Sequence, residues 1–279
     1  MLKFLKNWTL PLAMFAGAIG YFLLANVTIL EPAKPFVNWL IAVLTPFLIF
    51  AQLLLTFCKI EPKELLPKAW HVWLLSIQAV SSGIIALLLI FCPMEEAYRD
   101  IFEGAMVCLI CPTATAAAVI TGKLGGSAST LTTYTLLSNV LAAIAVPLVF
   151  PLVEPHADIT FVVAFLKILS KVFPLLLAPF FIALLFRYYI PSVHRLLSKY
   201  HGVAFYLWAV ALTIVTGQTV RSLVTAAADV SIEIMIALAG LATCCLQFYF
   251  GKRIGSAYHD RISAGQALGQ KNTVLAIWM

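Results

Sequence analysis

Long runs of apolar residues, separated by short polar stretches, recur along the whole chain. A helix needs roughly 20 apolar residues to cross the ~30 Å hydrocarbon core of a bilayer, so each run predicts one membrane-spanning helix. The first run is followed by many others and is therefore interpreted as a span, not as a cleaved signal peptide. The predicted spans are residues 8–27, 36–58, 69–91, 101–122, 127–150, 161–188, 203–225, 229–250 and 258–279.

Composition supports an all-α polytopic membrane protein. Hydrophobic residues make up 62% of the chain, charged residues 11%, and the mean hydropathy is +1.00, which excludes a soluble domain. A net charge of +6 would suit a nucleic-acid partner, but the basic residues lie in short loops between spans. No connection is long enough to hold a second domain. We therefore predict one transmembrane domain over residues 1–279, with the lipid bilayer and no nucleic acid among its partners.

Lys and Arg are distributed unequally between alternate loops. With the N-terminus inside, twelve of them fall in cytoplasmic connections and three, Lys34, Arg99 and Arg221, on the opposite side. Because basic residues collect on the cytoplasmic side of membrane proteins, we predict a cytoplasmic N-terminus. The expected location is the plasma membrane, specifically the inner membrane of a bacterium.

The order of the spans suggests an internal repeat. Five predicted spans precede the loop at 151–160 and four follow it, and an odd number of spans per repeat inverts the second copy. We expect a first repeat over residues 1–150 and an incomplete inverted repeat over 151–279. The similar segments Thr45–Gln52 and Leu212–Gln218 fall in the second and seventh spans. Nine of ten spans would then be present, and the natural protein is expected to continue for about one more span of ~20 residues.

Two spans are interrupted, at equivalent positions of the two repeats. In the fourth span Pro112, which removes one intrahelical hydrogen bond, precedes small residues from Thr113 to Ala118. In the ninth span we predict a break at Gly269, close to Lys271. A broken membrane helix is tolerated only beside protein or water, and its half-helix N-terminus suits a carboxylate or sulfonate. These features favour an anion-binding site at the bilayer midplane, built where the two half-helices cross.

The charge of Lys271 strengthens this interpretation. A charged side chain at membrane depth costs about 2.5–3.5 kcal/mol on insertion scales, so it requires a partner, a wet cavity or a function. Within the spans we find no Ser-His, paired-Asp or His-Glu-x-x-His arrangement, and we therefore predict no catalytic residue and no enzyme activity.

The two interruptions resemble the crossover motifs of the bile acid:sodium symporter family. The first is Cys111-Pro112-x-x-Thr115 followed by Val119, and the second is Gly269-x-x-Asn272. The resemblance covers essentially the whole chain in span number and loop order. It implies inverted five-helix repeats with crossed broken helices. The panel domain would contain spans 8–27, 36–58, 161–188 and 203–225, and the core domain spans 69–91, 101–122, 127–150, 229–250 and 258–279.

The resemblance also implies a function, which is secondary active transport of an organic anion by alternating access, normally coupled to two sodium ions. We expect a small organic anion as substrate and do not take the family name to mean bile acids. Two other functions stay open: a cation/proton antiporter of the same fold and a non-transporting membrane sensor. The lack of an acidic pair beside the crossover disfavours the antiporter.

At the sodium sites the chain departs from the family's pattern. The family's Ser-Asn pair falls on Ala117 and Ala118, and its shared glutamate falls on Ala267. Hard cations need about six oxygen ligands and benefit from a carboxylate, so two ordinary sodium sites, and any other metal or cofactor, are not expected. The residues that we assign to ion coupling, because they match coordinating positions or lie beside them, are Gln78, Thr135, Ser138, Asn139, Gln266 and Lys271.

Lys271 falls where the family has a glutamine, and we hypothesise that its ammonium replaces one sodium ion as a tethered cation. Transport would then be proton-linked or uncoupled. Alternatively, Lys271 snorkels or pairs structurally with a carbonyl or carboxylate. A register shift of one would instead align Gln270 with the family's glutamine and Gln266 with its glutamate. Substrate contacts are expected from Thr113, Thr115, Gln270, Lys271, Asn272 and Thr273.

Overall fold

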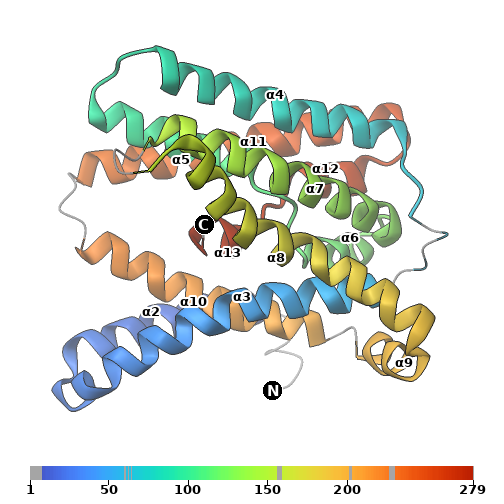
Figure 1. The fold of residues 1–279 in the computed structure, drawn as a ribbon, viewed down its shortest axis with the longest axis horizontal. Coiled ribbons are helices and arrows are strands. Elements are labelled where there is room, and N and C mark those ends of the chain that lie inside the picture. The colour runs from blue at the N-terminus through green and yellow to red at the C-terminus, as the bar shows by residue number, and fades with distance from the viewer. Residues whose placement is uncertain are drawn as a thin grey trace.

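The computed structural model describes residues 8–59, 61, 63, 65–155, 159–200, 203–225 and 230–278, and this part of the chain is predominantly α-helical (Figure 1). Seven of its helices are long and apolar enough to span a membrane. They are α2 (Thr9–Asn26), α3 (Lys34–Lys59, preceded by the 3₁₀ helix η1, Thr28–Ala33), α4 (Ala69–Phe91), α7 (Ala128–Val153), α8 (Phe161–Tyr189), α10 (Val203–Thr225) and α11 (Val230–Ala257). The prediction of an all-α membrane protein is confirmed.

The fourth and ninth predicted spans are the two that are not continuous helices. The fourth consists of α5 (Glu96–Ile110) and α6 (Ala117–Lys123), and the ninth of α12 (Arg261–Gly269) and α13 (Thr273–Trp278). The chain is therefore interrupted after residue 110 and again after residue 269, as the positions of Pro112 and Gly269 predict.

The helix α11 extends seven residues beyond the predicted end of the eighth span, because glycines let another helix pack on its extension. A Cβ added to Gly251 would lie 2.6 Å from the carbonyl oxygen of Ala264, and one added to Gly255 would lie 2.5 Å from the Ala264 Cβ. The backbones of α11 and α12 approach too closely for any larger residue. Because α12 packs on this extension, α11 continues as a helix beyond the apolar run.

A short helix, α9 (Pro191–Lys199), forms between the sixth and seventh predicted spans, in the connection 189–201 that the sequence predicted as a loop. Pro191 occupies its first turn, where a missing backbone N–H costs nothing. The Ser198 hydroxyl donates a 2.8 Å hydrogen bond to the Cys58 carbonyl at the end of α3. The helix thus packs on α3 and α8, and the prediction of a loop at 189–201 was wrong for residues 191–199.

The helices pack in two groups. Helix α10 packs on both α2 and α3 in the lower part of Figure 1, and α8 and α9 pack on α3. Helices α4, α5, α7, α11 and α12 form the second group, in the upper part of the same view. The groups meet where α7 packs on α8 and where α13 reaches α3 and α10.

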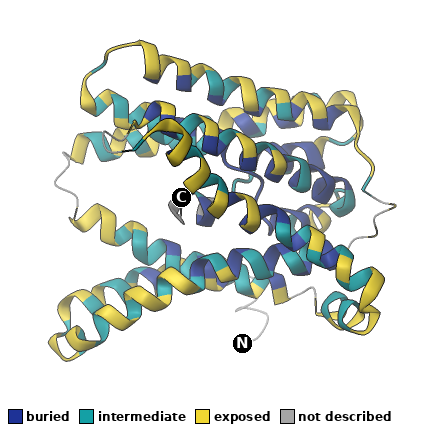
Figure 2. Cartoon of the chain, viewed as in Figure 1, coloured by how far each residue is buried: buried dark blue, intermediate teal, exposed yellow. Residues whose placement is uncertain are grey.

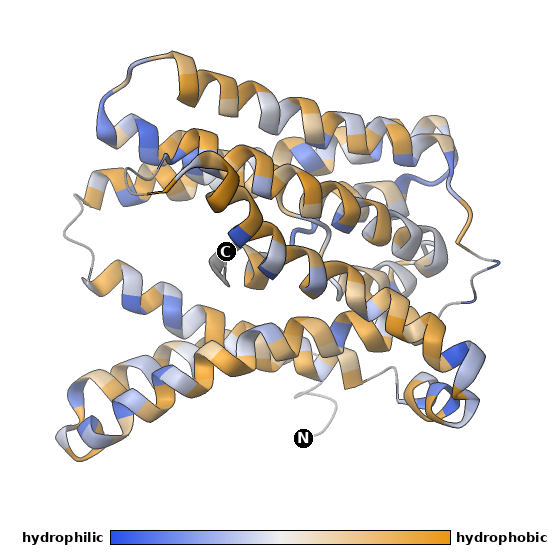
Figure 3. Cartoon of the chain, in the orientation of Figure 1, coloured by the Kyte–Doolittle hydropathy of each residue, from blue (hydrophilic) through white to orange (hydrophobic). Residues whose placement is uncertain are grey.

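Burial is concentrated at this junction, whereas the outer surfaces of the helices are exposed and largely apolar (Figures 2 and 3). The largest cluster of buried apolar residues joins α3, α7, α8, α10 and α13. A second cluster surrounds α6 and α12, where Ala117, Ala264 and Ala267 have no exposed surface. Small side chains let the two broken helices approach each other closely, and this approach creates the candidate site.

Candidate functional site

The first break, from Cys111 to Ala116, leaves the last carbonyls of α5 without helical partners. Three long side chains donate hydrogen bonds in place of the missing helical N–H groups. The Gln78 amide of α4 donates to the Ile110 and Cys111 carbonyls at 3.0 and 3.1 Å. The other two donors come from α11 and from the second break. Gln247 Nε2 donates to the Cys108 carbonyl at 3.3 Å, and Lys271 Nζ donates to the Leu109 carbonyl at 3.3 Å.

The second break follows Gly269, where a larger residue cannot be accommodated. A Cβ at this position would lie 2.4 Å from the Phe248 ring of α11. The helix then opens over Gln270 and Lys271 and restarts as α13. The Asn272 side-chain oxygen accepts a 3.2 Å hydrogen bond from the Leu275 N–H and so caps the first turn of α13. Asn272, predicted to contact substrate, is therefore placed at the crossing as a helix cap.

The two breaks lie antiparallel and exchange hydrogen bonds. The Ala114 N–H donates to the Gln270 carbonyl, and the Asn272 N–H donates to the Pro112 carbonyl, both at 2.9 Å. Thr113 and Lys271 thereby pair as an isolated β-bridge. Lipid cannot satisfy exposed backbone groups. Each break therefore supplies the partners that the other lacks, which explains why the two breaks lie side by side.

Side chains reinforce the pairing. The Thr113 hydroxyl donates a 2.7 Å hydrogen bond to the Ala267 carbonyl of α12. On the α7 side, the Thr113 N–H donates to the Ser138 hydroxyl at 3.2 Å. The Thr135 hydroxyl returns to the Leu131 carbonyl of its own helix at 3.0 Å. Of the two predicted α7 hydroxyls, Ser138 thus contacts the crossing directly, whereas Thr135 forms a bond within α7.

Lys271 carries the charge of the crossing. Its side chain is half-buried, and its ammonium lies at the carbonyl end of α5, which bears a partial negative charge. Among the described residues no carboxylate comes within ion-pair distance of Lys271. The carbonyl partner that the alternative interpretation of Lys271 predicted is present, whereas the lysine's role as a tethered cation stays a prediction.

Two buried amides beside the crossing are incompletely paired. Asn139 of α7 is 1% exposed, and neither its nitrogen nor its oxygen has a hydrogen-bond partner. Gln52 of α3 is 2% exposed and accepts a 2.7 Å hydrogen bond from the Thr115 hydroxyl, while its own nitrogen has no partner. Buried polar groups are nearly always hydrogen-bonded, so these orphaned atoms mark a place for an additional polar group.

Gln52 was missed as a site residue by the sequence reasoning. The sequence drew attention to Thr45–Gln52 only as a sign of repetition between the second and seventh spans. An amide in an otherwise apolar span was the available signal, and its pairing with Thr115 explains why it lies there. Through this bond, the first group of helices contacts the first break.

The remaining predicted residues lie near the crossing with fewer contacts. Gln266 and Gln270 are half-buried, and the Gln266 side-chain oxygen has no hydrogen-bond partner. Thr273 begins α13, but its side chain lies outside the described part of the structure. The three alanines that the resemblance aligns with sodium ligands, Ala117, Ala118 and Ala267, are buried and offer no side-chain oxygen. Within the described residues, no group of three or more His, Cys, Asp or Glu side chains could hold a metal ion.

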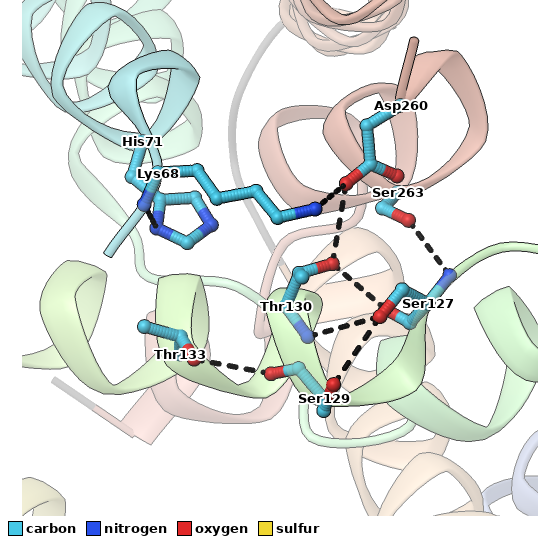
Figure 4. A network of polar contacts seen from close by, with 8 residues as sticks. All are labelled: Lys68, His71, Ser127, Ser129, Thr130, Thr133, Asp260 and Ser263. Atoms are coloured by element: carbon cyan, nitrogen blue, oxygen red, sulfur yellow. Dashed lines mark hydrogen bonds and ion pairs between the residues drawn. The ribbon is translucent and has the colours of Figure 1, made fainter. Parts of the chain in front are cut away.

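A separate polar network fixes the beginning of α12 (Figure 4). Lys68, just before α4, forms a 3.0 Å ion pair with Asp260, and the Thr130 hydroxyl of α7 donates to the same carboxylate oxygen at 3.4 Å. The Ser127 N–H donates to the Ser263 hydroxyl of α12 at 2.9 Å. These contacts join α4, α7 and α12 at one end of the molecule, and they hold α12 in the orientation that brings Lys271 to the first break.

Comparison with known proteins gives one family. The model described as Sodium Bile acid symporter family matches residues 3–226. This match includes the first break and ends before α11, α12 and α13, so the second break with Lys271 lies beyond it. No curated protein matches the sequence.

Proposed function

The chain belongs to the sodium bile acid symporter family, and on that premise we propose that it transports a small organic anion by alternating access, with the Lys271 ammonium in place of a sodium ion. The observation that carries the proposal is the position of Lys271 Nζ, 3.3 Å from the Leu109 carbonyl, at the crossing of two broken helices.

A sodium ion and an ammonium group make the same electrostatic contribution at this point. Each is a monovalent cation that favours carbonyl oxygens, and the carbonyl end of α5 supplies them. The alanines at positions 117, 118 and 267 remove the side-chain oxygens that a mobile cation would need. A cation tethered through Lys271 requires fewer ligands, because the covalent chain already holds it in place.

The orphaned amides support a substrate site beside this cation. An organic carboxylate requires a positive charge and hydrogen-bond donors. Lys271 offers the first, and the unpartnered nitrogens of Asn139 and Gln52 offer the second. An anion bound there would offset the loss of hydration of the half-buried Lys271 ammonium.

The two groups of helices support alternating access. Helices α2, α3, α8 and α10 correspond to the proposed panel, and α4, α5, α6, α7, α11, α12 and α13 to the proposed core. The Gln52–Thr115 hydrogen bond joins the two groups, and we propose that it breaks when the core moves against the panel. The inverted-repeat order of the helices belongs to the same proposal.

The test is counterflow exchange in proteoliposomes, with a set of anions that ranges from small monocarboxylates to taurocholate. We expect at least one labelled anion to exchange across the membrane, and its rate to change less than twofold when choline replaces sodium. A steep loss in choline would overturn the tethered-cation proposal while leaving transport intact. If none of these anions exchanges, the transport proposal is overturned and a sensor is favoured.

A further inference from the structure

A cavity lies away from the crossing, among α2, α3 and α10. Its volume is about 840 Å³, and none of its lining residues belongs to either break. Pockets that bind drug-sized ligands typically have volumes of about 300–1,000 Å³, so this one has room for an extended molecule. The proposed transport function does not require it.

Glycines on α2 create the cavity. Gly17 sits against α10 so closely that an added Cβ would lie 2.2 Å from the Thr213 carbonyl oxygen. One turn along the same helix, a Cβ added to Gly20 would meet nothing within 4 Å. The helices thus touch at Gly17 and leave open space at Gly20.

The charged part of the lining is cationic. Lys34 and Arg221 both line the cavity, and the lining includes no Asp or Glu. Arg221 Nη1 donates a 3.0 Å hydrogen bond to the Asn38 side-chain oxygen, which fixes the guanidinium and leaves it charged. Lys34 forms a 3.5 Å ion pair with Glu31, but the two side chains are 38% and 62% exposed, so the pair is weak.

The rest of the lining is largely apolar, with Leu24, Val37, Ile41 and Ile214 among its walls. An apolar wall with two cations matches a molecule that has an anionic head and an apolar body. We propose that this cavity binds an amphipathic organic anion, with its head at Arg221 and Lys34 and its body over Gly20.

Such a ligand has two possible sources: an anionic lipid of the surrounding bilayer or a free amphiphile. Native mass spectrometry on delipidated protein in a zwitterionic detergent distinguishes them, with phosphatidylglycerol and dodecanoate as probes. Phosphatidylcholine, which has similar chains and no net charge, is the control. We expect phosphatidylglycerol or dodecanoate to bind at least tenfold more tightly than phosphatidylcholine, and whichever of them binds identifies the source.

Two kinds of variant locate the site. Gly20→Leu should fill the open space and weaken binding at least tenfold, whereas Gly83→Leu on α4, which also meets nothing within 4 Å, should leave binding unchanged. Arg221→Gln combined with Lys34→Gln should weaken binding by a similar factor, and Arg253→Gln on α11 should not. Equal binding of phosphatidylcholine, no binding of either anionic probe, or unchanged binding by Gly20→Leu and the double variant would each overturn the proposal.

Discussion

The two breaks meet at one point and satisfy each other's backbone, yet they are built by opposite means. The first contains Pro112, which cannot donate, and small neutral residues around Thr115. The second relies on Gly269, which alone fits against Phe248, and it carries Lys271. The first break thus supplies carbonyl oxygens and the second supplies the cation that faces them. Two breaks that cross at one point need not carry equivalent chemistry.

This asymmetry has a physical basis. The backbone groups freed by a break are dipoles, and the other break can pair them without any charge. A single ammonium then suffices to give the crossing a net charge, whereas a second cation at the first break would lie a few ångströms away and repel it. The first break, with the neutral residues Ala117 and Ala118, therefore places no charge that would repel the Lys271 ammonium.

The largest expected effect comes from removing the charge of the second break. In Lys271→Gln, the amide keeps a donor for the Leu109 carbonyl but loses the cation. In the proposed function the partner of this cation is the bound anion. Truncating one partner of a buried charge pair costs about 2–5 kcal/mol, and every 1.4 kcal/mol is tenfold, so counterflow of the transported anion should fall more than tenfold. The midpoint of thermal unfolding in detergent should change little, because the capping bond remains.

Two companions sharpen this result. Lys271→Arg should retain part of the transport rate, since it keeps the charge. Lys199→Gln, which removes an exposed charge on α9, should behave as the parent. If Lys271→Gln transports as fast as the parent, the ammonium is only a cap for α5, and the proposed function of the charge is wrong.

The second-largest effect is expected from the packing of the second break. In Gly269→Ala, the new methyl would lie 2.4 Å from the Phe248 ring, and overpacking of this kind costs about 1–3 kcal/mol. We expect a lower midpoint of thermal unfolding, with partial recovery in the double variant Gly269→Ala/Phe248→Leu. A Gly269→Ala variant as stable as the parent would show that the glycine is not what opens the helix.

The sequence predicted more of the fold than of the site, for physical reasons. Hydrophobic runs report membrane spans directly, so α4 and α10 have the predicted bounds, and Pro112 marked a break because its chemistry is local. The loop at 189–201 was mispredicted for residues 191–199 because α9 forms on α3 and α8, which lie elsewhere in the sequence. Pairings such as Gln52 with Thr115 join spans 63 residues apart, and no local pattern reports them.

A smaller effect is expected from the hydroxyl that joins the two breaks. Thr113→Val removes the 2.7 Å bond to the Ala267 carbonyl in a buried site, at a cost of about 1–2 kcal/mol of unfolding free energy. The matched control is Thr132→Val on α7. That hydroxyl is equally buried but bonds only to the Ala128 carbonyl of its own helix at 2.8 Å, which already has a helical donor. The difference between the two variants, measured by thermal unfolding, isolates the bond between breaks, and equal losses would remove its special role.

The smallest effect is expected at the residue that first pointed to the site. Pro112→Ala should cost only about 0.4–1 kcal/mol, mainly through the greater freedom of the unfolded chain. The break should persist, because the Gln78 amide holds the Ile110 and Cys111 carbonyls, and the Pro112 carbonyl, which any residue would offer, accepts from Asn272. Counterflow should stay within about twofold of the parent, because the cost acts on the unfolded chain and the folded protein keeps these hydrogen bonds. A loss as large as that of Gly269→Ala would mean that the proline, and not the exchange of hydrogen bonds between the breaks, keeps the first helix open, and the two breaks would then be maintained independently.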